Sequence, residues 1–256
     1  MKSDYKGDFY DYSEHLTLTS AEAIVGEVMK IIQLDSLVDF GCGRAVWLKA
    51  WMHQGVDDVF GLDGDFVDPE RLWVEKSHFQ HADLSETVTL NRKFDLAQCL
   101  EVVEHLPEAS ADTIVKTLTD HADIVLFSAA PPGQGGFGHV NEQPHEYWRQ
   151  KFGKRGFEVY DPIRPRIKDR EEILPWYRYN LLLYVRAGSA DKLSEAVRGS
   201  RVGDDVAIPE AGPMCYRLRK RMLSWIPIPI MNQLALIKQG FALRRFRNAA
   251  ERTKEQ

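Results

Sequence analysis

The chain has 256 residues, a formal net charge of −5 and a hydrophobic content of 44%, which is ordinary for a globular protein with a substantial core. Its three cysteines, Cys42, Cys99 and Cys215, are far apart and form no Cys-x-x-Cys pair, which favours a reducing cytoplasm and argues against a structural zinc site or a disulfide frame. The charged N-terminus predicts no secretory signal, and no run approaches the roughly 20 apolar residues of a membrane-spanning helix.

Charge is distributed unevenly along the chain. Residues 214–256 contain ten Lys/Arg and two Asp/Glu, a net charge of +8, whereas the preceding 213 residues have a net charge of −13. A dedicated nucleic-acid binder would carry positive charge around its site, so this acidic body predicts no DNA partner. We expect a cytoplasmic protein whose partner is a small molecule.

Strands and helices alternate along most of the chain. The apolar runs predict strands over 36–41, 56–63, 77–84, 94–100, 123–130, 157–161 and 179–187. Helices are expected over 21–33, capped by Thr19 or Ser20, and then over 44–54, 69–74, from 107, and over 144–156. A Pro/Arg-rich connection, 162–178, precedes the last strand. This order predicts an α/β fold, a Rossmann-like, doubly wound and mostly parallel seven-stranded sheet over residues 1–187, with an N-terminal helical segment.

The segment from Leu37 to Leu48 organises the predicted fold. A strand leads into Asp39-x-Gly41-x-Gly43, and helical spacing resumes at Val46. Glycines in such a turn let a ligand lie against the backbone. In an open α/β sheet, this is where a ligand binds.

Three further motifs follow at strand ends: Asp63-Gly64, Asp83-Leu84, and Leu100-Glu101-Val102-Val103-Glu104-His105-Leu106-Pro107. Together with the glycine turn, this ordered set resembles the class I S-adenosylmethionine-dependent methyltransferases over about residues 20–187. The resemblance implies S-adenosylmethionine as cofactor. It further implies that Asp39, Gly41 and Gly43 contact the methionine part of the cofactor, and that Asp63 and Gly64 contact its ribose. Asp83 and Leu84 would contact the adenine. Gln98, Cys99 and Leu100 would line the sulfonium end.

Two rival classes of protein remain open at this stage. An NAD-type oxidoreductase needs a small residue at the sixth position of the glycine motif, and the chain has Val46 there. The acid that ends the second strand does not discriminate, because both cofactors contain a ribose. A cofactor-binding partner protein without catalysis is disfavoured by the intact Glu104, His105 and His139.

The acceptor side offers two hypotheses. Glu101, Glu104 and His105 have the i, i+3, i+4 spacing of one helical turn, and His139 follows a glycine-rich loop. In the first hypothesis, His105 or His139 is a general base, with Glu104 beside it. In the second, Glu101, Glu104, His105 and His139 bind a divalent metal, as the similar run in small-RNA 2′-O-methyltransferases implies. The first hypothesis is favoured.

Substrate contacts are predicted farther along the chain. His145 begins a helix, where an imidazole tends to stay neutral, and Trp148 follows on the same helix. Arg164 and Arg166 flank a proline and suit a carboxylate or phosphate. With these residues, the sequence resembles bacterial methyltransferases that modify saccharides or secondary metabolites.

The C-terminal extension, 188–256, is expected to be helical and basic. Apolar residues such as Trp225, Ile228 and Leu234 are edged by arginines, which predicts either peripheral contact with the inner membrane surface or a homo-oligomer contact. The sequence therefore predicts methyl transfer to a small-molecule hydroxyl. Metal-assisted 2′-O-methylation of RNA and N- or C-methylation are the alternatives.

Overall fold

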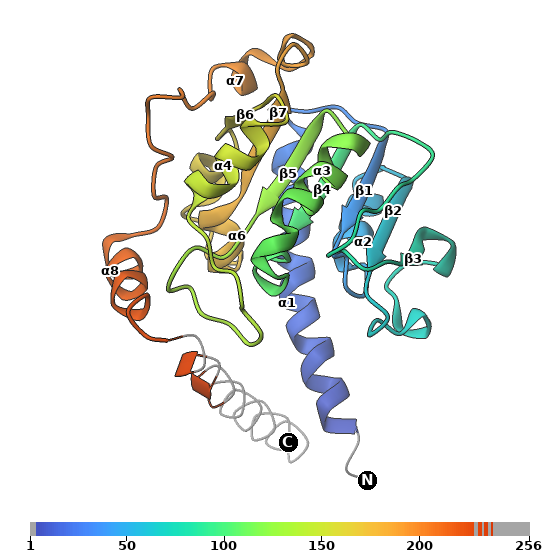
Figure 1. Cartoon of the computed structure of the whole chain (residues 1–256). Coiled ribbons are helices and arrows are strands. Elements are labelled where there is room, and N and C mark those ends of the chain that lie inside the picture. Colours follow the sequence, from blue (N-terminus) through green and yellow to red (C-terminus); the bar gives the residue numbers. More distant parts are fainter. Residues whose placement is uncertain (1–3, 228–229, 232, 235–236, 238–256) are drawn as a thin grey trace.

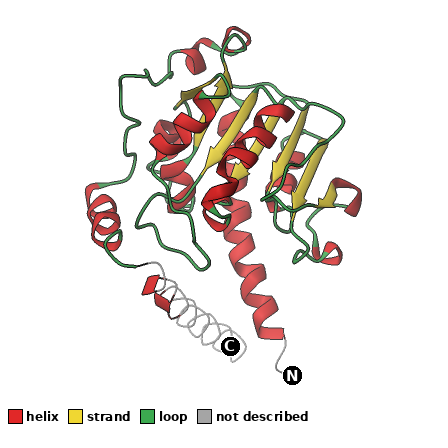
Figure 2. Ribbon diagram, viewed as in Figure 1, coloured by secondary structure: helices red, strands yellow, loops and turns green. Residues whose placement is uncertain are grey.

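The computed structural model describes residues 4–227, 230–231, 233–234 and 237 (Figure 1). A single sheet occupies its centre, and Figure 2 shows its strands in yellow between layers of helices. The strands are β1 (Ser36–Phe40), β2 (Asp58–Asp63), β3 (Phe79–His81), β4 (Leu96–Leu100), β5 (Ile124–Ser128), β6 (Phe157–Tyr160) and β7 (Leu182–Arg186).

The sheet has seven strands in the order β3-β2-β1-β4-β5-β7-β6. Neighbours are parallel from β3 to β5, whereas β7 runs antiparallel to both β5 and β6. The predicted Rossmann-like, mostly parallel seven-stranded fold is therefore confirmed. Because β1, β2, β4 and β5 point the same way, the turns that follow them meet at one edge, called here the carboxyl edge.

Helices cover both faces of the sheet. They are α1 (Asp4–Met29), α2 (Val46–His53), α3 (Ala111–His121), α4 (His145–Gly153), α5 (Arg164–Ile167), α6 (Pro175–Asn180), α7 (Glu195–Arg198) and α8 (Met214–Leu223). Short 3₁₀ turns add η1 (Pro69–Arg71), η2 (Lys76–His78), η3 (Val103–His105), η4 (Glu108–Ser110) and η5 (Ala190–Lys192). One core lies between the sheet and α1, α2, α5 and α6, and the other between the sheet and α3 and α4.

Several element boundaries differ from the sequence prediction. Helix α1 begins at Asp4, so Thr19 and Ser20 lie inside it and donate back to the carbonyls of His15 and Leu16 instead of capping it. The expected connection over 162–178 contains α5 and most of α6, which continues to Asn180 in place of the start of the strand expected over 179–187. Each of these short helices has a proline in its first turn, where a missing N–H costs nothing.

The antiparallel β7 delivers the chain to the edge opposite the carboxyl edge. Residues 188–213 then return along the side of the sheet and bring α8 beside the carboxyl edge (Figure 1). Of the expected helical extension over 188–256, the part beyond residue 227 lies mostly outside the described residues. None of the described helices is long and apolar enough to cross a bilayer.

Candidate functional site

The carboxyl edge of the sheet contains a cavity of about 710 Å³, a size that suits one small ligand or cofactor. Its walls come from the turns after β1, β2, β3 and β4 and from the glycine-rich loop after β5. The lining residues are Gly41, Asp63, Gly64, Asp65, Phe66, Ala82, Asp83, Leu84, Glu101, Val102, His105, Leu106, Phe137 and Gly138. Predicted cofactor contacts from three separate motifs therefore meet in one cavity.

The turn after β1 lies tightly against the segment after β4. Gly41 has a φ of +90°, which residues with side chains rarely adopt. A Cβ there would lie 2.3 Å and 2.7 Å from the methyl carbons of Val102. Ala45, two residues after Gly43 in the same turn, takes a left-handed φ of +66°. Backbone conformation and the closeness of Val102 thus both require glycine at position 41.

Asp63, the last residue of β2, is bonded to the same turn. Its Oδ2 accepts a hydrogen bond from the amide of Gly43 at 2.6 Å, and its Oδ1 accepts one from the amide of Gly64 at 2.7 Å. Burial raises the pKa of Asp63, and the two amide hydrogen bonds partly oppose that rise. The carboxylate therefore joins two motifs at the wall of the cavity.

Asp39 lies within β1, behind the cavity. It is 2% exposed, and its Oδ2 has no hydrogen-bond partner among the described residues. Burial raises the pKa of Asp39 to about 8, while the Gln98 side chain opposes this shift. The pairing of β1 with β4 places Gln98 directly beside Asp39. Asp39 is therefore a buried side chain beside Gln98 and does not line the cavity.

Four other predicted cofactor contacts also lie outside the cavity lining: Gly43, Gln98, Cys99 and Leu100. Cys99 is fully buried and Leu100 is 7% exposed, both in β4. Burial raises the pKa of the Cys99 thiol, so this thiol stays protonated within the core. Strand β4 thus ends directly before Glu101, which does line the cavity.

The far wall of the cavity combines a polar and an apolar group. Asp83 is exposed and its Oδ1 accepts hydrogen bonds from the amide and hydroxyl of Ser85, at 2.9 and 2.6 Å. These hydrogen bonds lower the pKa of Asp83, which keeps it ionised. Leu84 beside it is 5% exposed and packs into the core.

Two aromatic residues at the rim were missed in the sequence. Phe66 is 83% exposed and Phe137 is 62% exposed, and both line the cavity. A Cβ on Gly64 would lie 2.6 Å from the Phe66 ring, so this glycine lets the ring fold over the end of β2. Aromatic residues in polar loops at strand ends are the signal that could have identified them.

Glu104, His105 and His139 form a cluster at the acceptor side of the cavity. Their potential ligand atoms all lie within 4.8 Å of one another. The rings of His105 and His139 meet edge to face, with centroids 4.9 Å apart. The backbone aligns the two segments, because the carbonyl of Glu104 accepts hydrogen bonds from the amides of Val140 and Asn141. The structure therefore brings the three predicted catalytic residues together.

Glu101, the fourth predicted metal ligand, is not among the residues whose potential ligand atoms lie within 4.8 Å of one another. It has a φ of +57° and precedes η3, so the expected helical turn from Glu101 to His105 does not form. Its Oε2 accepts a hydrogen bond from Gln134 at 2.6 Å, and its Oε1 accepts one from Asn180 at 3.2 Å. Burial raises the pKa of Glu101, and these amides partly oppose the rise. Gln134 and Asn180 are polar neighbours of the site that the sequence did not reveal.

The two histidines are held by their Nδ1 atoms. His105 Nδ1 lies 3.2 Å from the carbonyl oxygen of Gly138, and His139 Nδ1 lies 2.8 Å from Glu142 Oε1. A carbonyl or a carboxylate can only accept, so Nδ1 carries the proton in each ring and Nε2 keeps its lone pair in the neutral form. Burial lowers the pKa of His105, and the neighbouring His139 lowers it further.

Glu104 is fully buried, and neither carboxylate oxygen has a hydrogen-bond partner among the described residues. Burial raises its pKa, and the charge of Glu101 raises it further. A set of one carboxylate and two imidazoles suits a divalent transition metal when the Nδ1 atom of each ring is held by a hydrogen bond and its Nε2 atom is left for the metal. The three residues Glu104, His105 and His139 therefore fit such an ion, and Glu101 does not belong to the set.

Glu142 organises the glycine-rich loop, a role the sequence did not assign. Its Oε2 accepts a hydrogen bond from the amide of Gly133 at 2.8 Å, and its Oε1 accepts from the amide of Gly135 at 2.7 Å and from His139. This loop and the segment after α8 enclose a second cavity of about 340 Å³, which His139 lines. His105 therefore lines the larger cavity and His139 lines this smaller one.

The four predicted substrate contacts lie away from the main cavity. Trp148 is 1% exposed and packs against Phe127 in the core. Arg164 is also 1% exposed, and its guanidinium donates to Asp161 and to the carbonyl of Tyr179. Arg164 therefore holds the structure together and is not free to grip a ligand.

His145 and Arg166, the other two predicted substrate contacts, also lie outside the lining of the main cavity. Burial, together with the charges of Arg164 and Lys220, lowers the pKa of His145 to about 3, so this ring is neutral as expected. Arg166 is exposed, and its Nη1 lies 3.7 Å from Oε2 of Glu27 in α1.

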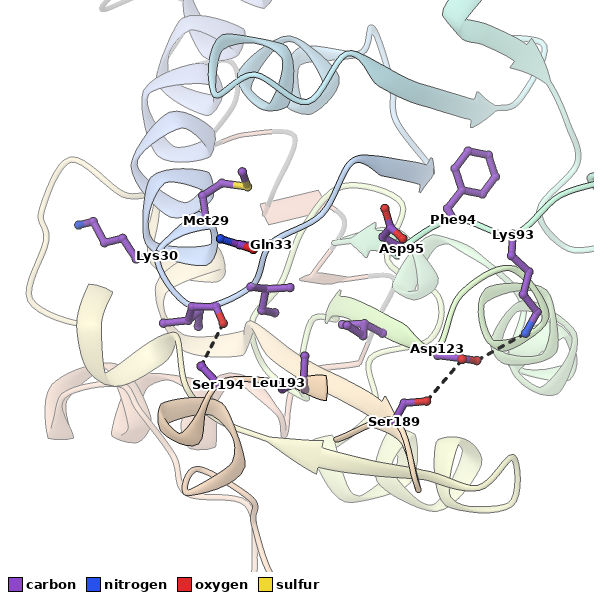
Figure 3. Close-up of a pocket in the computed structure, with 13 residues that line it drawn as sticks. Met29, Lys30, Gln33, Lys93, Phe94, Asp95, Asp123, Ser189, Leu193 and Ser194 are labelled. Atoms are coloured by element: carbon purple, nitrogen blue, oxygen red, sulfur yellow. Dashed lines mark hydrogen bonds and ion pairs between the residues drawn. The ribbon is translucent and has the colours of Figure 1, made fainter. Parts of the chain in front are cut away.

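A separate cavity of about 630 Å³ lies at the opposite edge of the sheet (Figure 3). Its polar side chains bond to one another: Ser189 donates to Asp123, Lys93 pairs with Asp123, and Ser194 donates to the Ile31 carbonyl. No buried unpartnered side chain faces it among the described residues. The carboxyl edge is therefore the better candidate for a ligand site.

Comparisons with known proteins bear on the domain and its fold. Residues 22–131 match the family described as "Methyltransferase domain". The fold is similar to Streptomyces venezuelae DesVI, with a TM-score of 0.54 and 15% identity over 71% of this chain and 98% of that one. It is also similar to magnesium protoporphyrin IX methyltransferase (ChlM) from Synechocystis PCC 6803 with bound SAM, with a TM-score of 0.50 and 19% identity over 73% and 86% of the two chains. No curated protein matches the chain.

Proposed function

We propose that this chain, a class I S-adenosylmethionine-dependent methyltransferase, transfers the methyl group to a hydroxyl of a small polar molecule, a saccharide or a secondary metabolite. The observation that carries the proposal is the Glu104–His105–His139 cluster beside the cavity that the cofactor motifs line. Hydroxyl groups need a base or a metal before they attack a methyl group, and this cluster can supply either.

The cavity has the groups that the cofactor requires. Asp63 places two carboxylate oxygens where a ribose would bind, and Asp83 with Leu84 gives a polar and an apolar contact for the adenine. The Gly41 turn leaves room for the methionine part. Bound S-adenosylmethionine supplies an electrophilic methyl on a sulfonium that leaves without help from an acid. The protein's task is then to orient the acceptor and take its proton.

His105 is the residue best placed to accept that proton. It lines the cavity, its Nδ1 is held by Gly138, and its lowered pKa keeps the ring neutral at physiological pH. The free Nε2 can then receive the hydroxyl proton. Glu101, with Gln134 and Asn180 around it, adds hydrogen-bonding groups that suit a hydroxylated acceptor.

A divalent metal held by Glu104, His105 and His139 is the second candidate. The specific observation in its favour is the buried Glu104 carboxylate without a hydrogen-bond partner among the described residues. A metal would lower the pKa of the acceptor hydroxyl. Methylation of an RNA 2′-hydroxyl would use the same chemistry, although the acidic body of the chain opposes RNA binding. N- or C-methylation remains the alternative reaction.

Calorimetric titration with S-adenosylhomocysteine, with NADH as the control ligand, tests the cofactor assignment. We expect binding heat with S-adenosylhomocysteine and none with NADH. Heat with NADH and none with S-adenosylhomocysteine would contradict the proposal. A labelled-methyl transfer assay over saccharides and other hydroxylated compounds then identifies the acceptor. His105→Gln should lower kcat by about a hundredfold or more with little change in S-adenosylhomocysteine affinity.

Chelation separates the two mechanisms. If EDTA leaves turnover intact, and elemental analysis finds no metal bound after exposure to Mn²⁺, the base mechanism stands. If EDTA abolishes turnover and Glu104→Gln abolishes Mn²⁺ binding measured calorimetrically, the metal mechanism replaces it.

A further inference from the structure

Helix α8 packs against the body along one face. Lys220 is 6% exposed and its Nζ lies 2.8 Å from Glu210 Oε2, and the ring of Tyr216 lies 4.9 Å from that of Tyr179. A Cβ at Gly133 would lie 2.0 Å from the carbonyl oxygen of Lys220, so the helix backbone rests directly on the glycine-rich loop. These contacts fix which side of α8 faces outward.

The outward side is apolar. Met214, Leu218 and Met222 are 68%, 55% and 68% exposed, and Trp225, just after the helix, is 84% exposed. At about 100° per residue the three helical positions span an arc of about 80°, centred roughly opposite Tyr216 and Lys220, and Trp225 follows the end of α8. We call these four residues the apolar stripe. The stripe points away from the body, so the rest of the described chain does not cover it.

Arginines border the apolar stripe on both sides. Arg219 lies on one border, and Arg217 and Arg221 lie on the other, and all three are exposed. Residues 214–227 contain no Asp or Glu. An apolar stripe with a tryptophan at one end and basic residues along both borders is the pattern of a helix that lies in a membrane interface.

We propose that the apolar stripe and its bordering arginines dock the protein on an anionic lipid surface. Charge complementarity favours this occupant, because phosphate-bearing headgroups supply the negative charge that residues 214–227 lack. A second copy docked symmetrically on the same face would bring two sets of three arginines together without neutralising acids. The described helices do not cross a bilayer, so α8 would lie on the surface.

Docking would have a consequence for the acceptor, and this step rests on the proposed function. The cavity of about 340 Å³ is lined on one side by His139 and Glu142 and on the other by Leu223, Ser224 and Ile226, which end and follow α8. A surface-bound α8 therefore holds this cavity beside the lipid headgroups. The acceptor class that fits is an amphiphile, with a hydroxylated head and a tail that remains in the bilayer.

Co-sedimentation with phosphatidylcholine vesicles, with and without phosphatidylglycerol, tests the docking surface using the full chain. We expect binding only with phosphatidylglycerol present, and weaker binding as salt screens the charges. Met222→Ser/Trp225→Ser should lower the partition coefficient by about a hundredfold, since each apolar side chain that leaves water contributes about tenfold. Val206→Ser, which alters an exposed valine outside α8, is the matched control and should bind as the wild type does.

The basic borders have their own test. Arg219→Gln/Arg221→Gln should weaken binding by about thirtyfold, because each basic residue near an anionic surface contributes about a factor of five. Lys154→Gln/Lys168→Gln removes the same charge from exposed positions on the body and should leave binding unchanged. Equal losses in the two double variants would show only a net-charge effect and would overturn the proposed surface.

Other outcomes identify other occupants. If vesicles do not bind while sedimentation velocity finds a dimer that Met222→Ser/Trp225→Ser dissociates, the apolar stripe is an interface between copies. Strong binding to pure phosphatidylcholine that salt does not change would overturn the anionic requirement. Titration with S-adenosylhomocysteine on the same preparations keeps the tests apart, because failed docking with intact cofactor binding leaves the methyltransferase proposal standing.

Discussion

Asp63 Oδ2 accepts a 2.6 Å hydrogen bond from the amide of Gly43, so the acid that ends β2 holds the turn that follows β1. Asp63→Ala removes this bond as well as the two oxygens proposed to bind the ribose. Affinity for S-adenosylhomocysteine should fall by about tenfold to a hundredfold, the usual value of hydrogen bonds to a charged group. Calorimetry measures it, and Asp57→Asn, an exposed acid just before β2, is the control. Unchanged affinity in Asp63→Ala would contradict the assignment of this pocket.

Gly41→Ala tests the packing of the two turns. The added methyl must displace Val102, and the backbone must keep a φ of +90°. We expect a loss of about 1–3 kcal/mol in the free energy of unfolding, measured in urea. Gly153→Ala is the control, because a Cβ there meets nothing within 4 Å, and it should be neutral or slightly stabilising. Adding Val102→Ala to Gly41→Ala should restore only the part of the lost unfolding free energy that is due to the clash with Val102. The part due to the positive φ should remain lost.

Glu142→Gln tests the order of the glycine-rich loop. The change weakens hydrogen bonds to the amides of Gly133 and Gly135 and to His139. Hydrogen exchange at the two amides should speed up, and kcat should fall by about tenfold to a hundredfold while S-adenosylhomocysteine affinity stays the same. Glu108→Gln, an exposed acid lining the same small cavity, should change neither measurement. If S-adenosylhomocysteine affinity falls while hydrogen exchange at the two amides is unchanged, the proposed role of Glu142 in ordering the loop is wrong.

His145 predicts an acid-sensitive fold. Its pKa is lowered to about 3 in the folded chain, whereas an unfolded histidine titrates near 6.5, so the unfolded chain binds more protons between these values. Stability from this group is present above about pH 6.5 and falls by up to about 1.4 kcal/mol per pH unit below it. Urea unfolding from pH 7 to pH 4 should show a shallower decline in His145→Gln than in the wild type. Parallel curves would mean that His145 is not the group responsible.

Much of the fold follows from local patterns. Each parallel strand is a short apolar run that ends in a turn, and Gly41, Asp63 and Asp83 were placed because they directly follow such runs. The carboxyl ends of parallel strands meet at one edge, so three separate motifs could be assigned to one cavity without knowing any distance. The start of α1 was missed because its first residues are polar and aromatic, with no apolar periodicity.

The acceptor side was less predictable because its geometry depends on loops. Burial decides whether an aromatic or an arginine is free to bind, and no local pattern indicates that Trp148 and Arg164 are each 1% exposed. Glu142 acquires its role only because the glycine-rich loop folds back on it. The positive φ of Glu101 breaks the helical spacing that grouped it with Glu104.

The route of residues 188–213 determines where the chain can be cut. Residues 200–202 pair with β6. The backbone amide of Asp161 donates to the carbonyl of Ser200, and the backbone amide of Val202 donates to the carbonyl of Val159. Arg149 and Glu146 of α4 bond to the backbone of Val206 and Ile208 farther along. An expression fragment that stops at residue 187 would leave an open sheet edge, which invites aggregation. A fragment that stops at residue 213 keeps that edge covered, so it is the shortest version in which the contribution of α8 can be measured by itself.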